Sequence, residues 1–181
     1  ESTLQSLKKD LKIDAFICSL LLQRQVNSLK KAQKFFRPDI DLLHDPFLMR
    51  DMKKVVEKIQ NSKEHRIMIL GDYDVDGTTS TAMLYKYFNN MDYDLLYYIP
   101  DRYEEGYGVS EKAIKYAEIN KVSLIITVDC GIKAVHQVNL SNSKNIDVII
   151  CDHHLPGEQI PNAFGILNPK QENCNYPFKD L

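Results

Sequence analysis

The chain has 181 residues, of which 44% are hydrophobic and 27% are charged, and its formal net charge is −2. These values are ordinary for a soluble globular protein, and no apolar run is long enough to span a membrane. The amino terminus lacks the order of a signal peptide, and the four cysteines form no CxxC pair. We therefore expect a cytoplasmic protein with reduced thiols and no membrane association.

Residues 1–65 are predicted to be helical. Asp14 is placed to cap one helix, residues 28–36 form a short amphipathic helix, and Asp45 with Pro46 begins a third that runs to about residue 63. Residues 1–66 carry fourteen Lys and Arg against nine Asp and Glu. This excess indicates a solvated lysine-rich surface, with attraction of a polyanion as the alternative interpretation.

From residue 66 the pattern changes to alternating strands and helices. Short runs rich in Ile and Val predict strands near residues 66–70, 94–100, 123–129 and 147–152, with a further short strand at 163–167. The segments between them predict helices near residues 78–89, 110–121 and 133–144. This alternation predicts an α/β fold with a parallel sheet and flanking helices, preceded by a helical amino-terminal segment. We expect two parts, residues 1–65 and residues 66–181.

Three carboxylates follow the first predicted strand at every second position. Asp72, Asp74 and Asp76 repel one another unless a cation or another strong partner offsets their charges. The same spacing opens a calcium-binding EF-hand loop, but the twelfth position here is Met83, which cannot ligate calcium, and a strand precedes the loop. A solvated acidic turn is the plainer alternative, which does not explain the position between a buried strand and a helix.

Further polar residues follow two other predicted strands. Asp129 closes the third strand, and Asp152, His153 and His154 follow the fourth. Taken separately, Asp129 could be a turn former and the histidines structural hydrogen-bonding groups. In a parallel sheet, however, the carboxyl ends of these strands meet at one edge. Carboxylates with imidazole suit Mn²⁺ or Mg²⁺, and less directly Zn²⁺ or Fe²⁺. A carboxylate shared between two such ions would make a two-metal centre, the usual device for hydrolysing phosphate esters.

The segments GDYDVDG, VDCG and DHH, in this order and at successive strand ends, resemble the first motifs of the DHH phosphoesterase superfamily. The loop IPDRYEEGYGVS and the tail LNPKQENCNYPFKDL are similar to those of its single-stranded-DNA-specific exonucleases in bacteria. The resemblance implies a DHH phosphoesterase-like fold and a nuclease that hydrolyses single-stranded DNA from its 5′ end. It also implies two Mn²⁺ or Mg²⁺ ions, a role in DNA repair and recombination, and single-strand-binding protein and a helicase as partners.

The resemblance also implies roles for individual residues. The implied metal ligands are two acids of the first motif, a bridging carboxylate and the first histidine of DHH: Asp74, Asp76, Asp129 and His153. The implied catalytic group contains a histidine near the scissile phosphate and two supporting acids: His154, Asp72 and Asp152. The implied substrate contacts lie in the EGYG loop: Arg102, Gly106 and Gly108. A surface salt bridge is the alternative for Arg102.

One departure from the family pattern concerns the end of the chain. Members of the superfamily have a further metal-binding Asp in a later motif, which we do not find after His154. We therefore expect an amino-terminal fragment, incomplete at its carboxyl end, without full activity. Two alternatives remain: another DHH phosphoesterase that cleaves oligonucleotides, cyclic dinucleotides or pyrophosphate, and a non-catalytic metal- or nucleic-acid-binding scaffold. Asp72 disfavours the pyrophosphatases, which usually have a His-bearing first motif.

Overall fold

The computed structural model describes residues 2–180, and the chain divides into two compact units after His44. The first unit contains three helices: α1 (Ser2–Leu11), α2 (Ala15–Gln23) and α3 (Leu29–Phe36). Asp14 caps α2 through the amide of Phe16, as predicted, and Ser28 caps α3 through the amide of Lys31. The helices enclose a small core of their own, made by Leu7, Cys18, Leu21, Val26 and Ala32.

The second unit is built on a five-stranded parallel sheet. Its strands are β1 (Ile67–Gly71), β2 (Leu95–Tyr98), β3 (Leu124–Val128), β4 (Asp147–Cys151) and β5 (Gly165–Leu167). They lie in the order β2-β1-β3-β4-β5, and every neighbouring pair is parallel. The predicted α/β class is therefore confirmed. The order reverses between β1 and β3, and such a reversal creates a crevice at the carboxyl ends of the strands.

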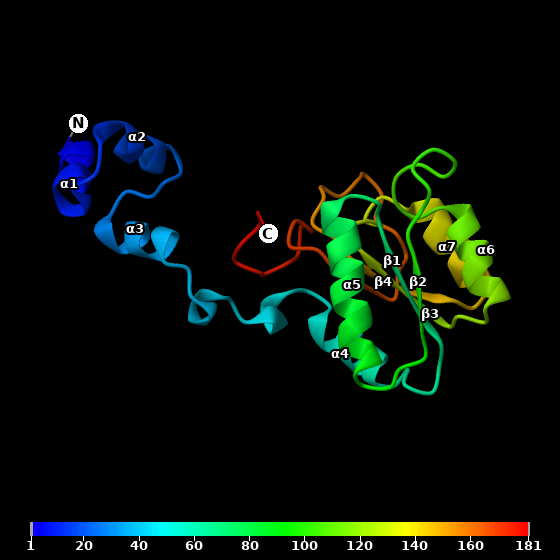
Figure 1. The fold of residues 1–181 in the computed structure, drawn as a ribbon. Coiled ribbons are helices and arrows are strands. Elements are labelled where there is room, and N and C mark those ends of the chain that lie inside the picture. Colours follow the sequence, from blue (N-terminus) through cyan, green and yellow to red (C-terminus); the bar gives the residue numbers. More distant parts are fainter. Residues whose placement is uncertain (1, 181) are drawn as a thin grey trace. The chain divides into compact units, whose positions relative to one another are not determined.

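Helices cover both faces of this sheet (Figure 1). One face packs against α4 (Met52–Gln60) and α5 (Val75–Asn89), and the other against α6 (Glu111–Ile119) and α7 (Val135–Ser143). Alternate residues of each central strand serve the two faces: Ile67 and Ile69 of β1 point to one core, Met68 and Leu70 to the other. All five residues of β1 and all five of β3 are buried, as expected for strands covered on both sides.

The single helix predicted from Asp45 to about residue 63 is wrong. Asp45 and Pro46 begin only a short 3₁₀ turn, η2 (Pro46–Leu48), and α4 starts separately at Met52. Between them Asp51 has a left-handed backbone with φ of 66°, and its carboxylate accepts a hydrogen bond from the amide of Ile166 at 3.1 Å. This contact with β5 diverts the chain, and local helical spacing cannot predict such a long-range bond.

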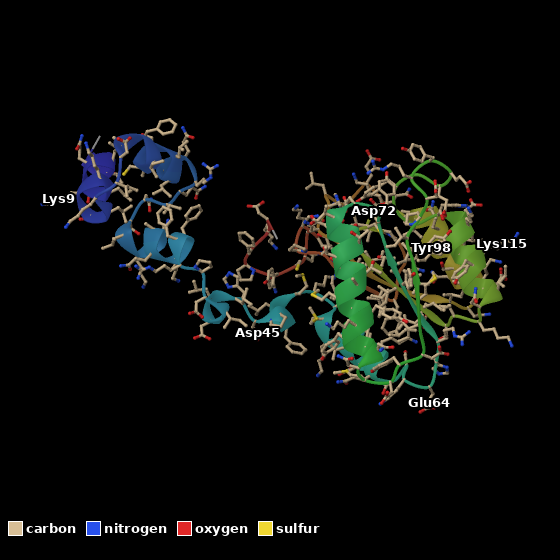
Figure 2. All side chains as sticks on the ribbon, in the orientation of Figure 1. Lys9, Asp45, Glu64, Asp72, Tyr98 and Lys115 are labelled. Atoms are coloured by element: carbon tan, nitrogen blue, oxygen red, sulfur yellow. The ribbon has the colours of Figure 1, made fainter. Side chains whose placement is uncertain are left out.

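Residues 45–65 pack with the sheet unit, and the predicted division into domains at residue 65 stays a prediction. A second 3₁₀ turn in the chain, η1, covers Ile40–Leu42. Within residues 2–180 no helix is both long enough and apolar enough to cross a membrane. In the sheet unit, Glu64 precedes β1 at one end of the sheet, and Asp72 follows β1 at the opposite end, where α5 begins (Figure 2).

Candidate metal centre

Asp72 lies at the exit of β1 and is completely buried. Its Oδ1 accepts a hydrogen bond from the amide of Gly108 at 3.0 Å, which ties the loop after β2 to the end of β1. Within the described residues its Oδ2 is buried and has no hydrogen-bond partner. A buried carboxylate oxygen without a donor is costly, so this atom marks a place where a cation would be stabilising.

Asp74 and Asp76 lie at the start of α5, which begins three residues before the predicted position. Asp74 is the N-cap, and its Oδ1 accepts a hydrogen bond from the amide of Gly77 at 3.0 Å. That bond, with a smaller contribution from Asp129, holds the pKa of Asp74 below its ordinary value. Asp76 is exposed in the first turn and lines a cavity of about 340 Å³ together with Asp129 and His153.

Asp129 follows β3 and is strongly constrained. It has a left-handed backbone, with φ of 60°, which costs a non-glycine residue about 1–3 kcal/mol and tends to occur at functional sites. Its Oδ1 lies 3.1 Å from Nε2 of His153, whereas its Oδ2 is buried without a hydrogen-bond partner in residues 2–180. Burial, and then the negative charge of Asp74, raises the pKa of Asp129 to about 6.

Both carboxylate oxygens of Asp152 accept hydrogen bonds from main-chain amides. Its Oδ1 accepts hydrogen bonds from the amides of His153 at 2.7 Å and His154 at 3.0 Å, and it lies 2.8 Å from Nδ1 of His154. Its Oδ2 accepts a hydrogen bond from the amide of Ile132 at 2.9 Å. These contacts indicate a carboxylate that orients the loop after β4 and the ring of His154. Its supporting role in catalysis stays a prediction.

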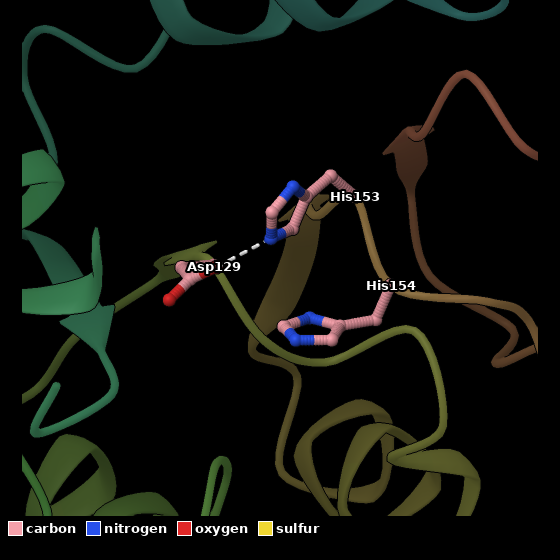
Figure 3. Close-up of side chains that lie close together, drawn as sticks. All are labelled: Asp129, His153 and His154. Carbon is pink, nitrogen blue, oxygen red and sulfur yellow. Dashed lines mark ion pairs between the residues drawn. The ribbon is translucent and has the colours of Figure 1, made fainter. Parts of the chain in front are cut away.

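The two histidines extend from this loop toward Asp129 (Figure 3). One ligand atom from each of Asp129, His153 and His154 lies within 4.8 Å of the others. The two imidazole rings are edge to face, with centroids 4.8 Å apart. Three residues from the ends of β3 and β4 are therefore brought together, as the parallel-sheet argument predicted.

The three predicted substrate-contact residues lie in the loop after β2 and have different surroundings. Gly108 has φ of +83° and donates its amide to Asp72, whereas Gly106, at +78°, has open space where a side chain would be. Arg102 is exposed, and its guanidinium lies over the ring of Tyr73 at 4.5 Å. A ring contact of 6.3 Å between Tyr73 and Tyr107 connects this pair with the site.

Tyr107 is a site residue that the sequence reasoning missed. Its hydroxyl donates a hydrogen bond to the main-chain carbonyl of Asp129 at 3.0 Å and lies 3.4 Å from a ring nitrogen of His154. Burial, and then the charge of Asp129, raises the pKa of this phenol, so it remains a donor throughout the physiological range. Its place between two glycines of the EGYG loop was the available signal.

This donor set fits a divalent cation. Carboxylate oxygens suit Mn²⁺ and Mg²⁺, and a cluster that adds imidazole nitrogens suits first-row transition metals such as Mn²⁺ better than Mg²⁺. When the charge of an acidic cluster is not compensated, carboxylate oxygens lack partners and carboxyl pKa values rise. Both features occur here, in the unpartnered oxygens of Asp72 and Asp129 and in the raised pKa of Asp129. The ligand assignments of Asp74, Asp76, Asp129 and His153 remain predictions.

Comparison with known proteins agrees with the resemblance seen in the motifs. The family model described as "DHH family, N-terminal domain" matches residues 66–176. The single-stranded-DNA-specific exonuclease RecJ of Bacillus subtilis is 40% identical over all of this chain, and that of Escherichia coli is 39% identical over 72% of it. The chain spans only 23% of the length of each of these relatives.

Two solved structures are also similar. An exonuclease RecJ bound to manganese has a TM-score of 0.65 and 28% identity, covering 72% of this chain and 34% of its own. The RecJ of Thermus thermophilus in complex with Mn²⁺ has a TM-score of 0.71 over 99% of this chain and 25% of its own, and at 20% identity it supports the fold alone. With a family model that covers more than half of its residues, the chain belongs to the DHH family.

Proposed function

We propose that this chain carries most of the metal ligands of a 5′→3′ exonuclease that hydrolyses phosphodiester bonds of single-stranded DNA. The observation that supports this most is the cluster of Asp129, His153 and His154 at the carboxyl ends of β3 and β4, in which one oxygen of Asp129 is buried without a hydrogen-bond partner in the described residues. The substrate class follows from the relatives, which are single-stranded-DNA-specific exonucleases.

The proposed ligands are Asp74, Asp76, Asp129 and His153. Two Mn²⁺ or Mg²⁺ ions, when bound, supply positive charge that lowers the pKa of an attacking water and stabilises negative charge on the phosphoryl oxygens. Asp129 faces both Asp74 and His153, so its carboxylate would hold a cation together with either of them. Bound cations would compensate the charges of Asp74, Asp76 and Asp129. They would also offset the repulsion by Asp74 that contributes to the raised pKa of Asp129.

The remaining residues of the site orient the reacting groups. Asp152 lies against Nδ1 of His154, which favours the tautomer with the proton on Nδ1 and a lone pair on Nε2. The scissile phosphate is proposed to lie near this ring. Arg102 would contact a phosphate from its stack on Tyr73, and Gly106 and Gly108 would let the DNA backbone approach the loop. Asp72 supports this arrangement through its bond to Gly108.

The cellular setting is part of the same proposal. We place the protein in the cytoplasm, in DNA repair and recombination, with single-strand-binding protein and a helicase as its partners. Residues 1–65 would form a helical amino-terminal part and residues 66–181 the phosphoesterase part of the enzyme.

The test uses the protein that carries this chain at its natural length, with Mn²⁺ and end-labelled DNA. We expect release of the 5′ label from single strands and not from blunt duplexes, with at least a hundredfold loss in Asp74→Ala and Asp129→Ala, the scale expected for removal of catalytic charge stabilisation. Preferred cleavage of a cyclic dinucleotide would favour another DHH phosphoesterase. Metal binding without hydrolysis of any of these substrates would favour a scaffold, and undiminished activity in both variants would contradict the site.

A further inference from the structure

The main chain of the two histidines is hydrogen-bonded from both sides. Its amides donate to Oδ1 of Asp152, as described above. Its two consecutive carbonyls accept from side chains of the tail segment: Nζ of Lys170 donates to the carbonyl of His153 at 2.6 Å, and Nδ2 of Asn168 donates to the carbonyl of His154 at 2.9 Å. The loop that presents both imidazoles is therefore held at four adjacent polar groups.

The sheet places Asn168 and Lys170 beside this loop. β5 pairs in parallel with β4, with Cys151 opposite Leu167, and the amide of Asp152 donates to the carbonyl of Leu167 at 3.0 Å. The residues that follow β5 consequently run next to the residues that follow β4. This explains why the LNPK segment contacts the histidines although it contributes no side chain to the metal cluster.

Asn168 is itself rigidly held. It is completely buried, and its Oδ1 accepts a hydrogen bond from the amide of Lys170 at 2.8 Å. The side chain of Gln171 donates to the carbonyl of Asn168 at 3.2 Å and to that of Ile166 at 2.9 Å. An amide with this support can fix a neighbouring carbonyl to within a few tenths of an ångström, which is the precision that a metal centre requires.

We propose that Asn168 and Lys170 are positioning residues that set the metal affinity of the site by fixing the main chain of His153 and His154. This inference rests on the proposed function, because it assumes that His153 ligates the metal. Without the two bonds the loop would sample positions in which Nε2 of His153 no longer lies 3.1 Å from Asp129. Loss of outer contacts of this kind typically weakens metal binding by about 10–100-fold.

The positive charge of Lys170 allows a positioning role to be distinguished from a role through charge alone. An ammonium group near a metal centre repels a divalent cation, so a role through charge alone predicts tighter Mn²⁺ binding when the charge is removed. A positioning role predicts the opposite sign. Lys54 provides the matched control, because it lines the same cavity as Lys170 but pairs with Asp51 at 3.3 Å.

The experiment measures Mn²⁺ binding to the chain by calorimetry and electron paramagnetic resonance. We expect Lys170→Met to weaken binding about tenfold, Lys170→Arg to restore it to within about threefold, and Lys54→Met to leave it unchanged. Thermal melting without metal shows that each variant is folded. Unchanged or tighter binding in Lys170→Met would overturn the proposal.

A second readout needs no metal. In imidazole nitrogen spectra of the metal-free chain, Lys170→Met should shift or broaden the signals of His153, and Asn168→Ala those of His154, while His136 on α7 stays unchanged. Identical spectra in both folded variants would overturn the positioning role. If the unsubstituted chain binds no Mn²⁺, the proposed metal centre fails, and these spectra still decide whether the two side chains hold the histidines.

Discussion

Asp129 lowers the stability of the metal-free chain. Its backbone is left-handed, one carboxylate oxygen is buried without a hydrogen-bond donor in residues 2–180, and Asp74 faces it. The left-handed backbone lowers the stability of the fold, and the other two features destabilise the ionised side chain. Residues that lower stability in this way are characteristic of sites shaped by function rather than by folding.

This residue makes the unfolding free energy of the metal-free chain depend on pH. The pKa of Asp129 is about 6 in the folded state, above its ordinary value of 3.8, so the folded chain binds the extra proton. The contribution of the Asp129 carboxyl group to the free energy of unfolding therefore falls as pH rises from about 4 to 6. We expect Asp129→Asn to stabilise the metal-free chain by about 1–3 kcal/mol at pH 8, measured by urea unfolding.

The same variant has a second, opposite effect. Asp129→Asn should lower Mn²⁺ affinity at pH 8, because it removes a proposed carboxylate ligand and a negative charge that attracts the cation. The gain in stability should shrink as the pH approaches 4, where the carboxyl group is largely protonated in the folded state. A destabilised Asp129→Asn chain at pH 8 would contradict the repulsion described here.

At the scale of elements, the close contact between β1 and α5 brings the first acids to the site. A side-chain carbon on Gly77 would lie 2.4 Å from the carbonyl oxygen of Asp72 and 2.5 Å from its nitrogen. The first turn of α5 can therefore lie directly against the end of β1 only because this position has no side chain. Asp74 and Asp76 reach the crevice through this contact.

We therefore expect Gly77→Ala to destabilise the chain by about 1–3 kcal/mol, because backbone atoms of Asp72 cannot move aside as a flexible side chain would. Gly157→Ala is the matched control, since the nearest atom to its new carbon would be at 3.6 Å, an ordinary contact. Urea unfolding measures both variants. Equal stability of the two variants would show that the contact between β1 and α5 can relax.

The limits of prediction from sequence are clearest at these junctions. Strand alternation and caps such as Asp14, which accepts from the amide of Phe16, depend on neighbouring residues and were predicted correctly. The start of α5 was missed because Asp74 serves as both N-cap and candidate ligand, and the pattern favours either. Tyr107, Asn168 and Lys170 were not predicted because their partners are main-chain carbonyls, which strand pairing brings near and no side-chain pattern records.

At the scale of the whole molecule, the chain consists of two units with separate cores. The sheet, the candidate ligands and the segment with Asn168 and Lys170 all belong to the unit that begins at Asp45. Residues 1–44 carry eight Lys and Arg against five Asp and Glu, and residues 45–66, which belong to the sheet unit, carry six against four. Metal binding and any attraction of DNA by the basic residues of the first unit are therefore separable properties.

Removal of residues 1–44 tests this separation. We expect the shortened chain to unfold in one cooperative transition and to bind Mn²⁺ within about twofold of the longer chain, since a domain with its own core folds alone. Thermal melting and calorimetry are the measurements. A shortened chain that fails to fold, or that loses Mn²⁺ binding, would show that the first unit supports the second.

The reversal of strand order between β1 and β3 has a kinetic consequence. Asp72 and Asp129 become neighbours only after α5, β2 and α6, which lie between them in the chain, have been enclosed by strand pairing. Closing so long a segment is slow, so these two carboxylates meet late in folding. A bound cation would then act on the native state rather than on the folding transition state, and would lengthen the lifetime of the folded chain without hastening its formation.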